Sequence, residues 1–155
     1  MQKLLCVLIF TWYVVANLLS DNDRQAILEC HLRLREIVQP NASNMWLMEY
    51  SKEVEKLAET FVETCPSEQD EPSFSDVGFV EPVSYYFKPE YNKSFCQIKM
   101  PKTGYNCTPA EKGCRFYKQM VWANSTHVGC AAKKCQMNKG FFNTRFVLVC
   151  LYKPG

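Results

Sequence analysis

Residues 114–130, CRFYKQMVWANSTHVGC, place three aromatic side chains and a histidine between two cysteines. The aromatic residues are Phe116, Tyr117 and Trp122, and the histidine is His127. Such a segment can carry a reactive site, because a cysteine becomes a nucleophile when a histidine lies beside it in the fold. It can equally be structural, with rings that fill the core and cysteines that form disulfides. The rest of the sequence favours the structural interpretation.

The length and composition of the chain predict one globular domain. A chain of 155 residues can bury one hydrophobic core but not two. Hydrophobic residues make up 47% of the chain and charged residues 22%, which is ordinary for a globular protein. The net charge is only +2, and the basic residues are scattered except for the pair Lys133–Lys134. A nucleic-acid partner is therefore not expected.

The first 16 residues, MQKLLCVLIFTWYVVA, have the pattern of a secretory signal peptide. One early lysine precedes an apolar run, and the small residue Ala16 offers a cleavage site, with Ser20 as a later alternative. A membrane anchor is the competing interpretation, but the run is shorter than the roughly 20 residues that span a bilayer. The sequence predicts a secreted, extracellular protein with no membrane span once the signal is removed.

The cysteine and asparagine patterns agree with secretion. Cys6 would leave with the signal, and the mature chain keeps eight cysteines: Cys30, Cys65, Cys96, Cys107, Cys114, Cys130, Cys135 and Cys150. An even number in a small secreted domain predicts disulfides, whereas a zinc site would favour paired C-x-x-C spacings, which do not occur. Four N-glycosylation sequons begin at Asn41, Asn92, Asn106 and Asn124. We therefore expect a disulfide-bonded glycoprotein.

Hydrophobic periodicity predicts two helices in the first half of the chain. Between residues 26 and 38, apolar residues recur every three or four positions, and Pro40 ends the helix. Residues 51–65 carry the stronger helical pattern. Ser51 is a suitable N-cap for that second helix, and Pro66 follows its end.

The second half of the chain predicts loops followed by strands. Residues 66–95 hold four prolines and no clear period, so we expect long irregular loops there. Residues 145–153, RFVLVCLYK, form a nearly continuous apolar run that is typical of a central strand. Residues 126–135 can pair with it as a hairpin neighbour, with the turn in residues 136–143. Helices that precede strands indicate an α+β domain.

Three ordered motifs resemble the CAP superfamily, which comprises cysteine-rich secretory proteins, antigen 5 and plant pathogenesis-related proteins. The segment ECHLRLREIVQPNASNMWLMEYSKEVEKLAETFVETC resembles the family's opening, with Tyr50 where the family has tryptophan. FYKQMVWANSTHVGCAAKKC resembles the signature His-Tyr-Thr-Gln-x-Val-Trp, and VLVCLYKPG resembles Cys-Asn-Tyr-x-Pro. The matching positions are His31, Arg35, Pro40, Ala42, Ser43, Asn44, Met45, Tyr117, Gln119, Val121, Trp122, Gly129, Cys130, Cys135, Cys150, Tyr152 and Pro154. The secreted venom-allergen-like proteins of parasitic worms are the branch that we expect.

The resemblance implies a three-layer α-β-α sandwich around a small antiparallel sheet, as a single disulfide-stapled domain over residues 24–155. It implies the disulfides Cys65–Cys135 and Cys130–Cys150, of which the second would join the two predicted strands. It leaves four cysteines in pairs that we do not assign: Cys30, Cys96, Cys107 and Cys114.

The resemblance also points to a degenerate metal site. Many family members hold two histidines and two glutamates in a cleft that can bind a divalent metal. Here Phe116 stands at one histidine position and Phe79 near one glutamate position, while the other histidine position falls near Gln69. Glu90 is the remaining candidate carboxylate. Because a phenyl ring offers no lone pair, we expect no metal, no other cofactor and no catalytic residue, and we expect His31 to be a hydrogen-bonded fold residue.

Three functions remain open on this sequence. The first is a non-enzymatic glycoprotein that binds extracellular protein partners, in a host if the chain comes from a parasitic worm. The second is a sterol or fatty-acid carrier with an apolar groove formed by Phe79, Tyr85, Tyr86 and Phe87, although we favour the simpler interpretation that these rings cover the core. The third is a metal-dependent hydrolase. Residues 114–130 are interpreted as fold, with Tyr117 and Trp122 in the core and Cys130 in a strand.

Overall fold

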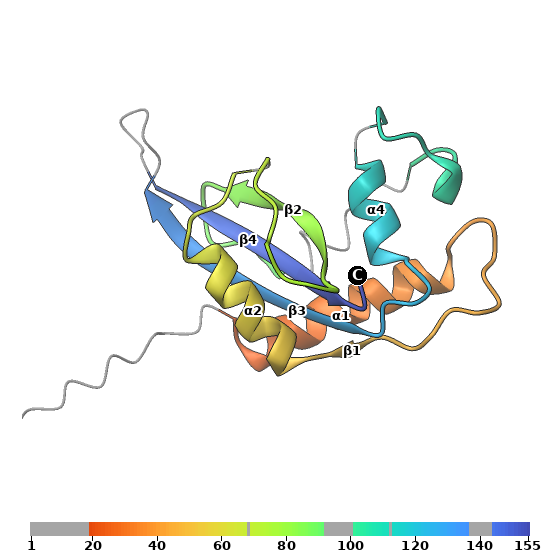
Figure 1. The fold of residues 1–155 in the computed structure, drawn as a ribbon, viewed down its shortest axis with the longest axis horizontal. Coiled ribbons are helices and arrows are strands. Elements are labelled where there is room, and N and C mark those ends of the chain that lie inside the picture. Colours follow the sequence, from red (N-terminus) through yellow and green to blue (C-terminus); the bar gives the residue numbers. More distant parts are fainter. Residues whose placement is uncertain (1–18, 68, 92–100, 112, 137–143) are drawn as a thin grey trace, which may run out of the picture.

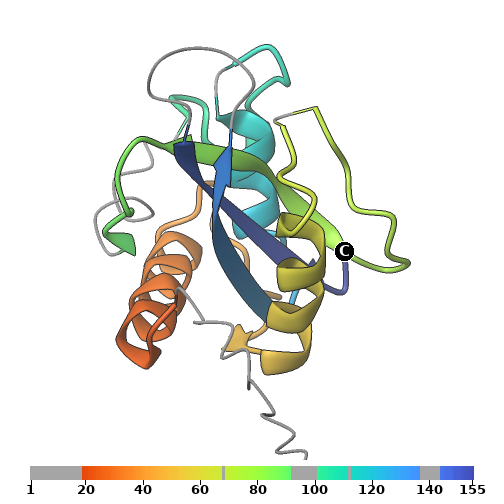
Figure 2. The ribbon, with the colours of Figure 1, turned by 90° about the vertical axis from the view of Figure 1, so that its left-hand side faces the viewer.

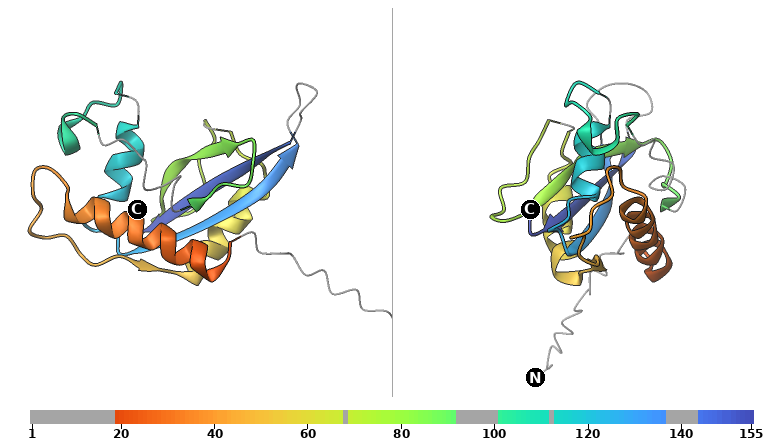
Figure 3. Two further views of the ribbon diagram at one scale, coloured as in Figure 1. Left: turned by 180° about the vertical axis from the view of Figure 1, so that it is seen from behind. Right: turned by 90° about the vertical axis from the view of Figure 1, so that its right-hand side faces the viewer.

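A four-stranded sheet with helices on both faces forms the domain. The computed structural model describes residues 19–67, 69–91, 101–111, 113–136 and 144–155. Helices α1 (Asp21–Glu36) and α4 (Cys114–Met120) pack on one face of the sheet, and α2 (Lys52–Val62) packs on the other (Figure 1 and Figure 2). The view from behind in Figure 3 shows α1 lying across the sheet on the side away from α2. The predicted three-layer α-β-α sandwich is confirmed.

The sheet has the strand order β1-β3-β4-β2. Its strands are β1 (Glu49–Tyr50), β2 (Gly78–Tyr85), β3 (His127–Gln136) and β4 (Thr144–Lys153). The β3–β4 and β2–β4 pairs are antiparallel, whereas the short strand β1 runs parallel to β3. A short 3₁₀ helix, η1 (Gly104–Asn106), precedes α4.

Strand β4 is buried on both faces, as its nearly continuous apolar sequence predicts. Side chains alternate across a strand, so each face of β4 contributes to a different core layer. Leu148, Cys150 and Tyr152 pack with α1 and α4. Val147, Val149 and Leu151 pack with α2. Cys30, Leu34 and Tyr117 are among the helical residues of the first layer, and Val54, Ala58 and Val62 belong to the second.

Helix α1 begins at Asp21, five residues before the predicted start at residue 26. Ser20 caps the helix, because its hydroxyl accepts a hydrogen bond from the Asp23 N–H while the Asp23 carboxylate accepts one from the Ser20 N–H. The preceding residue, Leu19, is buried in the first core layer. The fold therefore includes residues that precede the domain boundary expected at residue 24.

Helix α2 begins where the sequence predicts, with Ser51 as its N-cap. The Ser51 hydroxyl accepts a hydrogen bond from the Val54 N–H over 3.3 Å, and the Ser51 N–H donates to the Val128 carbonyl over 2.8 Å. The start of α2 lies directly against β3 at Gly129. A Cβ atom at Gly129 would stand 2.1 Å from the Glu55 nitrogen, so only glycine fits there.

A buried ion pair joins α1 to the start of α2. Arg24 donates two hydrogen bonds to the Glu55 carboxylate, over 2.6 Å and 2.8 Å. The Tyr50 hydroxyl donates to Glu55 over 2.6 Å and accepts from the Cys130 N–H over 3.1 Å. Burial opposes the charge on Glu55, but the bonds from Arg24 and Tyr50 outweigh it and lower the pKa of Glu55. The tyrosine that replaces the family's tryptophan thus connects β1, α2 and β3.

Three disulfides join described residues. Cys65 pairs with Cys135, and Cys130 pairs with Cys150, as the resemblance implies. Cys107 pairs with Cys114, a pair that the sequence did not assign. Cys30 is also disulfide-bonded, to a partner outside the described residues, where Cys96 lies as well.

The structure differs from the sequence analysis at three places. The expected loop region 66–95 contains strand β2, which pairs with β4 through a register shift between Val80 and Val83. Helix α4 was not predicted. Trp122 does not fill the core, because 43% of its surface is exposed, whereas Tyr117 is fully buried.

No helix among the described residues is long and apolar enough to cross a membrane.

Candidate functional site

A cavity between the start of β2 and α4 contains both phenylalanines that stand at expected metal-ligand positions. Its volume is about 330 Å³. Phe79 reaches it from β2 and Phe116 from α4. The lining residues are Val77, Gly78, Phe79, Arg115, Phe116, Lys118, Gln119 and Trp122. We call this space the Phe79–Phe116 cavity.

The side chains around the Phe79–Phe116 cavity do not suit a divalent metal. None of its described lining residues is a histidine, cysteine, aspartate or glutamate. Two of them, Arg115 and Lys118, carry positive charge, which opposes a cation. The Gln119 amide is turned to Ser125, whose hydroxyl accepts its N–H over 3.4 Å. Nowhere in the described part of the chain do three or more potential metal-binding side chains gather.

The other two expected positions lie elsewhere. Glu90 is exposed and lines a different cavity, and Gln69 is exposed in the segment after α2. The structure therefore brings Phe79 and Phe116 together but does not bring Glu90 to them. The phenyl rings occupy the place where the resemblance puts ligands.

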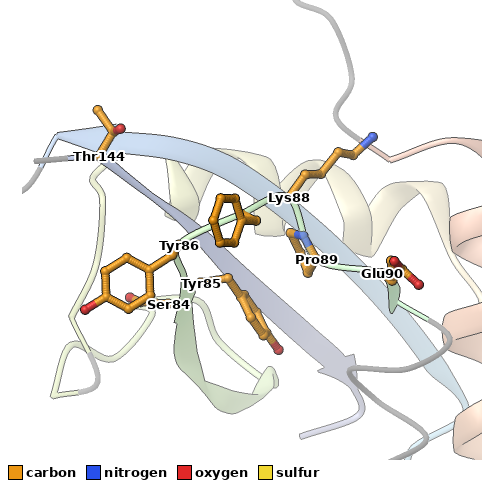
Figure 4. A pocket seen from close by; sticks show the side chains of 8 residues that line it. Ser84, Tyr85, Tyr86, Lys88, Pro89, Glu90 and Thr144 are labelled. Atoms are coloured by element: carbon orange, nitrogen blue, oxygen red, sulfur yellow. The ribbon is translucent and has the colours of Figure 1, made fainter. Parts of the chain in front are cut away.

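A larger apolar cavity lies at the end of β2. Its volume is about 800 Å³, and Figure 4 shows Tyr85, Tyr86 and Glu90 among the side chains around it. Tyr86 is 64% exposed and Phe87 is 84% exposed, so the expectation that these rings cover the core is wrong for both. Tyr85 is half-buried against the first core layer. We call this space the Tyr86–Phe87 cavity.

The aromatic residues expected to form one groove are separated in the structure. Phe79 does not line the Tyr86–Phe87 cavity but packs against the α2 side of the core and lines the Phe79–Phe116 cavity. The Arg145 guanidinium lies 4.5 Å from the centre of the Tyr86 ring, which lines the larger cavity. Arg145 also donates a hydrogen bond to the Tyr86 hydroxyl over 3.0 Å. This contact orients the ring beside the cavity.

The surroundings of both histidines indicate structural or surface roles rather than catalytic ones. His31 is fully buried, and its Nδ1 donates to the Ile27 carbonyl over 2.7 Å. Its Nε2 must therefore accept a hydrogen bond from the Tyr152 hydroxyl, 2.8 Å away. Burial lowers the pKa of His31 to about 4. His127 is exposed at the first position of β3, where its Nδ1 lies 2.8 Å from the Thr126 hydroxyl.

The sequon asparagines that the structure describes lie at the surface. Asn41, Asn106 and Asn124 are exposed, and Asn92 lies outside the described residues. All described cysteines are in disulfides, so none of them offers a thiol nucleophile. The hypothesis of a cysteine–histidine site in residues 114–130 is wrong, because Cys114 and Cys130 are both paired.

Comparison with solved structures supports the fold. The structure matches Schistosoma mansoni venom allergen-like protein 4 with a TM-score of 0.61 and 24% identity, over 88% of this chain and 90% of that chain. It matches hookworm platelet inhibitor with a TM-score of 0.58 and 20% identity, over 88% of this chain and 71% of that chain. At these identities the likeness concerns the fold alone.

Comparison with protein sequences gives the family. Cysteine-rich secretory protein LCCL domain-containing 1 from Homo sapiens is 32% identical over 152 residues, and peptidase inhibitor 15 from Gallus gallus is 32% identical over 155 residues. Both matches cover 88% of this chain, but the chain spans only 30% and 59% of the two relatives. Residues 28–152 match the cysteine-rich secretory protein family, CAP. The chain, with its α-β-α sandwich and its three ordered motifs, belongs to the CAP family.

Proposed function

We propose that this protein is a secreted, non-enzymatic CAP glycoprotein that acts by binding an extracellular protein. The observation that carries the proposal is the Phe79–Phe116 cavity. Its two phenyl rings stand at positions where the resemblance would put metal ligands, and two cations lie beside them. The described histidines and cysteines are engaged elsewhere. Because the described lining of this cavity offers no histidine, cysteine or carboxylate, we assign the domain a function in recognition.

Three features support the secretory part of the proposal. Residues 1–16 have a signal-peptide pattern, the structure contains disulfides, and the chain carries four sequons. Disulfides persist in oxidising compartments and in the extracellular space. One relative, 32% identical to this chain, bears the name peptidase inhibitor 15, which describes inhibition of a peptidase. We extend to this chain only the idea that binding rather than catalysis is the activity.

The test begins with the purified glycosylated protein as bait in extracellular fluid. We expect one dominant protein to be captured, and we expect that protein to bind saturably when both components are pure. The matched bait carries Tyr86→Ser and Phe87→Ser, two exposed positions whose replacement leaves the core intact. Absence of any saturable protein partner, together with stoichiometric lipid in the purified protein, would contradict the proposal.

A second candidate function is lipid binding at the Tyr86–Phe87 cavity. About 800 Å³ is within the range of sites that hold small ligands, and exposed apolar rings beside the cavity favour an apolar ligand. In this case Tyr86→Ser and Phe87→Ser should weaken binding of a fluorescent sterol or fatty acid while the melting temperature stays nearly unchanged. If the parent binds neither probe, the carrier function is excluded.

A further inference from the structure

The sequon at Asn124 follows an exposed tryptophan by two residues. Trp122 exposes 43% of its surface at the end of α4, and Asn124 is exposed. The sequence of this segment is Trp122-Ala-Asn124-Ser-Thr126. The core does not account for either exposed side chain, although Trp122 also lines the Phe79–Phe116 cavity.

A tight turn holds these two residues close together. The Ser125 N–H donates to the Trp122 carbonyl over 3.1 Å, which closes a four-residue turn with Trp122 first and Asn124 third. Both ends of the turn are anchored. Arg35 donates to the Trp122 carbonyl over 2.8 Å, and the buried Ser125 hydroxyl donates to the Pro154 carbonyl over 2.8 Å. Because the turn is fixed at both ends, a group attached to Asn124 stays near Trp122.

The first sugar of an N-linked glycan suits an indole as its neighbour. One face of N-acetylglucosamine consists mainly of C–H bonds, which pack against the electron-rich face of an aromatic ring. The other sequons lack this arrangement. The residue two positions before the asparagine is Gln39 for Asn41, Glu90 for Asn92 and Gly104 for Asn106. Asn124 is the sequon with an aromatic residue at that position.

We propose that the first sugar on Asn124 packs against the Trp122 indole, covering an exposed apolar surface and stabilising the turn between α4 and β3. In the attachment step, the Asn124 Nδ2 forms a bond to C1 of a lipid-linked oligosaccharide. The C1–oxygen bond to the lipid pyrophosphate breaks, the pyrophosphate leaves, and Nδ2 loses one proton. The inference rests on the secretory route of the proposed function, but it requires no protein partner and no lipid ligand.

The test compares how much the Asn124 sugar raises the melting temperature in proteins with and without the Trp122 indole. The protein is expressed in eukaryotic cells behind a signal sequence of known efficiency, so failure of residues 1–16 to direct export would not affect the result. Glycans are trimmed to one N-acetylglucosamine, and each form is compared with its Asn124→Gln counterpart. We expect the sugar to raise the melting temperature by about 2–4 °C in the parent and by nearly nothing in Trp122→Ala.

Two internal controls sharpen this comparison. Trp46 is the other exposed tryptophan of the described chain, 65% exposed, and its backbone N–H donates to the Ala123 carbonyl over 3.3 Å. Because Trp46 lies beside the turn but does not precede a sequon by two residues, Trp46→Ala should keep the gain from the sugar. Removing the sugar at Asn41 by Asn41→Gln should give the same small change whether or not Trp122 is present.

A second measurement covers the case in which Trp122→Ala does not fold. In the parent, the N-acetyl methyl protons of the Asn124 sugar should show an upfield NMR shift from the indole ring current, unlike those at Asn41. An equal thermal gain in Trp122→Ala, an unshifted methyl signal, or an unoccupied Asn124 in the secreted protein would each overturn the proposal.

Discussion

Two phenylalanine residues determine the chemistry of the Phe79–Phe116 cavity. A structural zinc ion needs several nitrogen, oxygen or sulfur ligands at about 2.0–2.3 Å. Phe116 and Phe79 offer none, and the cations Arg115 and Lys118 lie around the same space. We therefore predict that this cavity does not bind zinc.

We expect the purified protein to contain no stoichiometric zinc. Chelator should leave its melting temperature unchanged, because a ligand stabilises only a fold that binds it. Phe116→His should not create a tight site, since one imidazole cannot hold the ion alone. It should instead lower stability relative to Phe116→Leu, because a polar ring replaces an apolar one that packs against the first core layer. Elemental analysis measures the metal, and about one zinc per chain in the parent would show that the assignment of ligand positions is wrong.

The buried His31 makes a pH-dependent contribution to stability. Burial lowers the pKa of His31 in the folded state to about 4, from its usual 6.5. Between these two values the unfolded chain binds a proton that the folded chain does not, so the contribution is complete above pH 6.5 and is lost as the pH falls towards 4. The expected loss is about 3 kcal/mol.

Urea unfolding at a series of pH values measures that loss, and proton NMR of the histidine rings assigns it. The chain has two histidines, so the assignment needs one control variant. The His127→Gln variant should lose as much stability as the parent when the pH falls from 6.5 towards 4, because His127 is exposed. The ring signal that remains in this variant should stay that of a neutral imidazole at pH 5. Protonation of His31 near pH 6.5 in the folded protein would contradict its burial.

The sequence predicted single residues well where hydrogen-bonding chemistry or pairing decided their place. Ser51 was predicted as a cap, and His31 was expected to be a fold residue. It failed for Trp122, Tyr86 and Phe87, which are exposed. An apolar residue type favours burial, but much of any folded surface is still apolar, so residue type alone does not place a single ring.

At the scale of elements, long and regular patterns were reliable and interrupted ones were not. Helix α2 and strands β3 and β4 appear where period and composition predicted them. Strand β2 was missed because it contains Pro82 and a register shift that break its alternation. Proline is tolerated there because β2 is an edge strand. Helix α4 is only seven residues long, too short for a periodic signal.

Contact between α2 and β3 depends on Gly129. A Cβ atom at this position would lie 2.1 Å from the Glu55 nitrogen and 2.5 Å from the Val54 carbonyl carbon, both of which are backbone atoms. Gly129→Ala should therefore push α2 away from the sheet and cost about 3 kcal/mol of the free energy of unfolding, the upper end of the range for overpacking. Chemical denaturation measures the cost.

Gly113→Ala is the matched control for Gly129→Ala. Gly113 has a φ of 81°, and an added Cβ would meet nothing within 4 Å. This variant should cost only about 1 kcal/mol, from the left-handed backbone alone. Equal costs for the two variants would mean that the close approach of α2 to β3 does not contribute to stability.

At the scale of the whole molecule, the predicted signal cleavage site lies close to residues that stabilise the N-terminal end of α1. The sequence allows signal cleavage after Ala16 or as late as Ser20. The structure bears on this choice, because the fold uses residues between the two sites. Leu19 is 2% exposed and belongs to the first core layer, and Ser20 forms the capping box of α1. Cleavage after Ser20 would remove both.

We therefore expect the secreted protein to begin at Asn17, which N-terminal sequencing and intact mass can establish. Recombinant forms that begin at Asn17, Leu19 and Asp21 test the reason. The first two keep the buried leucine and the cap and should be equally stable. The third loses a buried leucine side chain, which costs about 2–5 kcal/mol, and a helix cap, which costs about 1 kcal/mol. A secreted protein that begins at Asp21 and unfolds at the same urea concentration as the Asn17 form would show that Leu19 and Ser20 do not stabilise the folded domain.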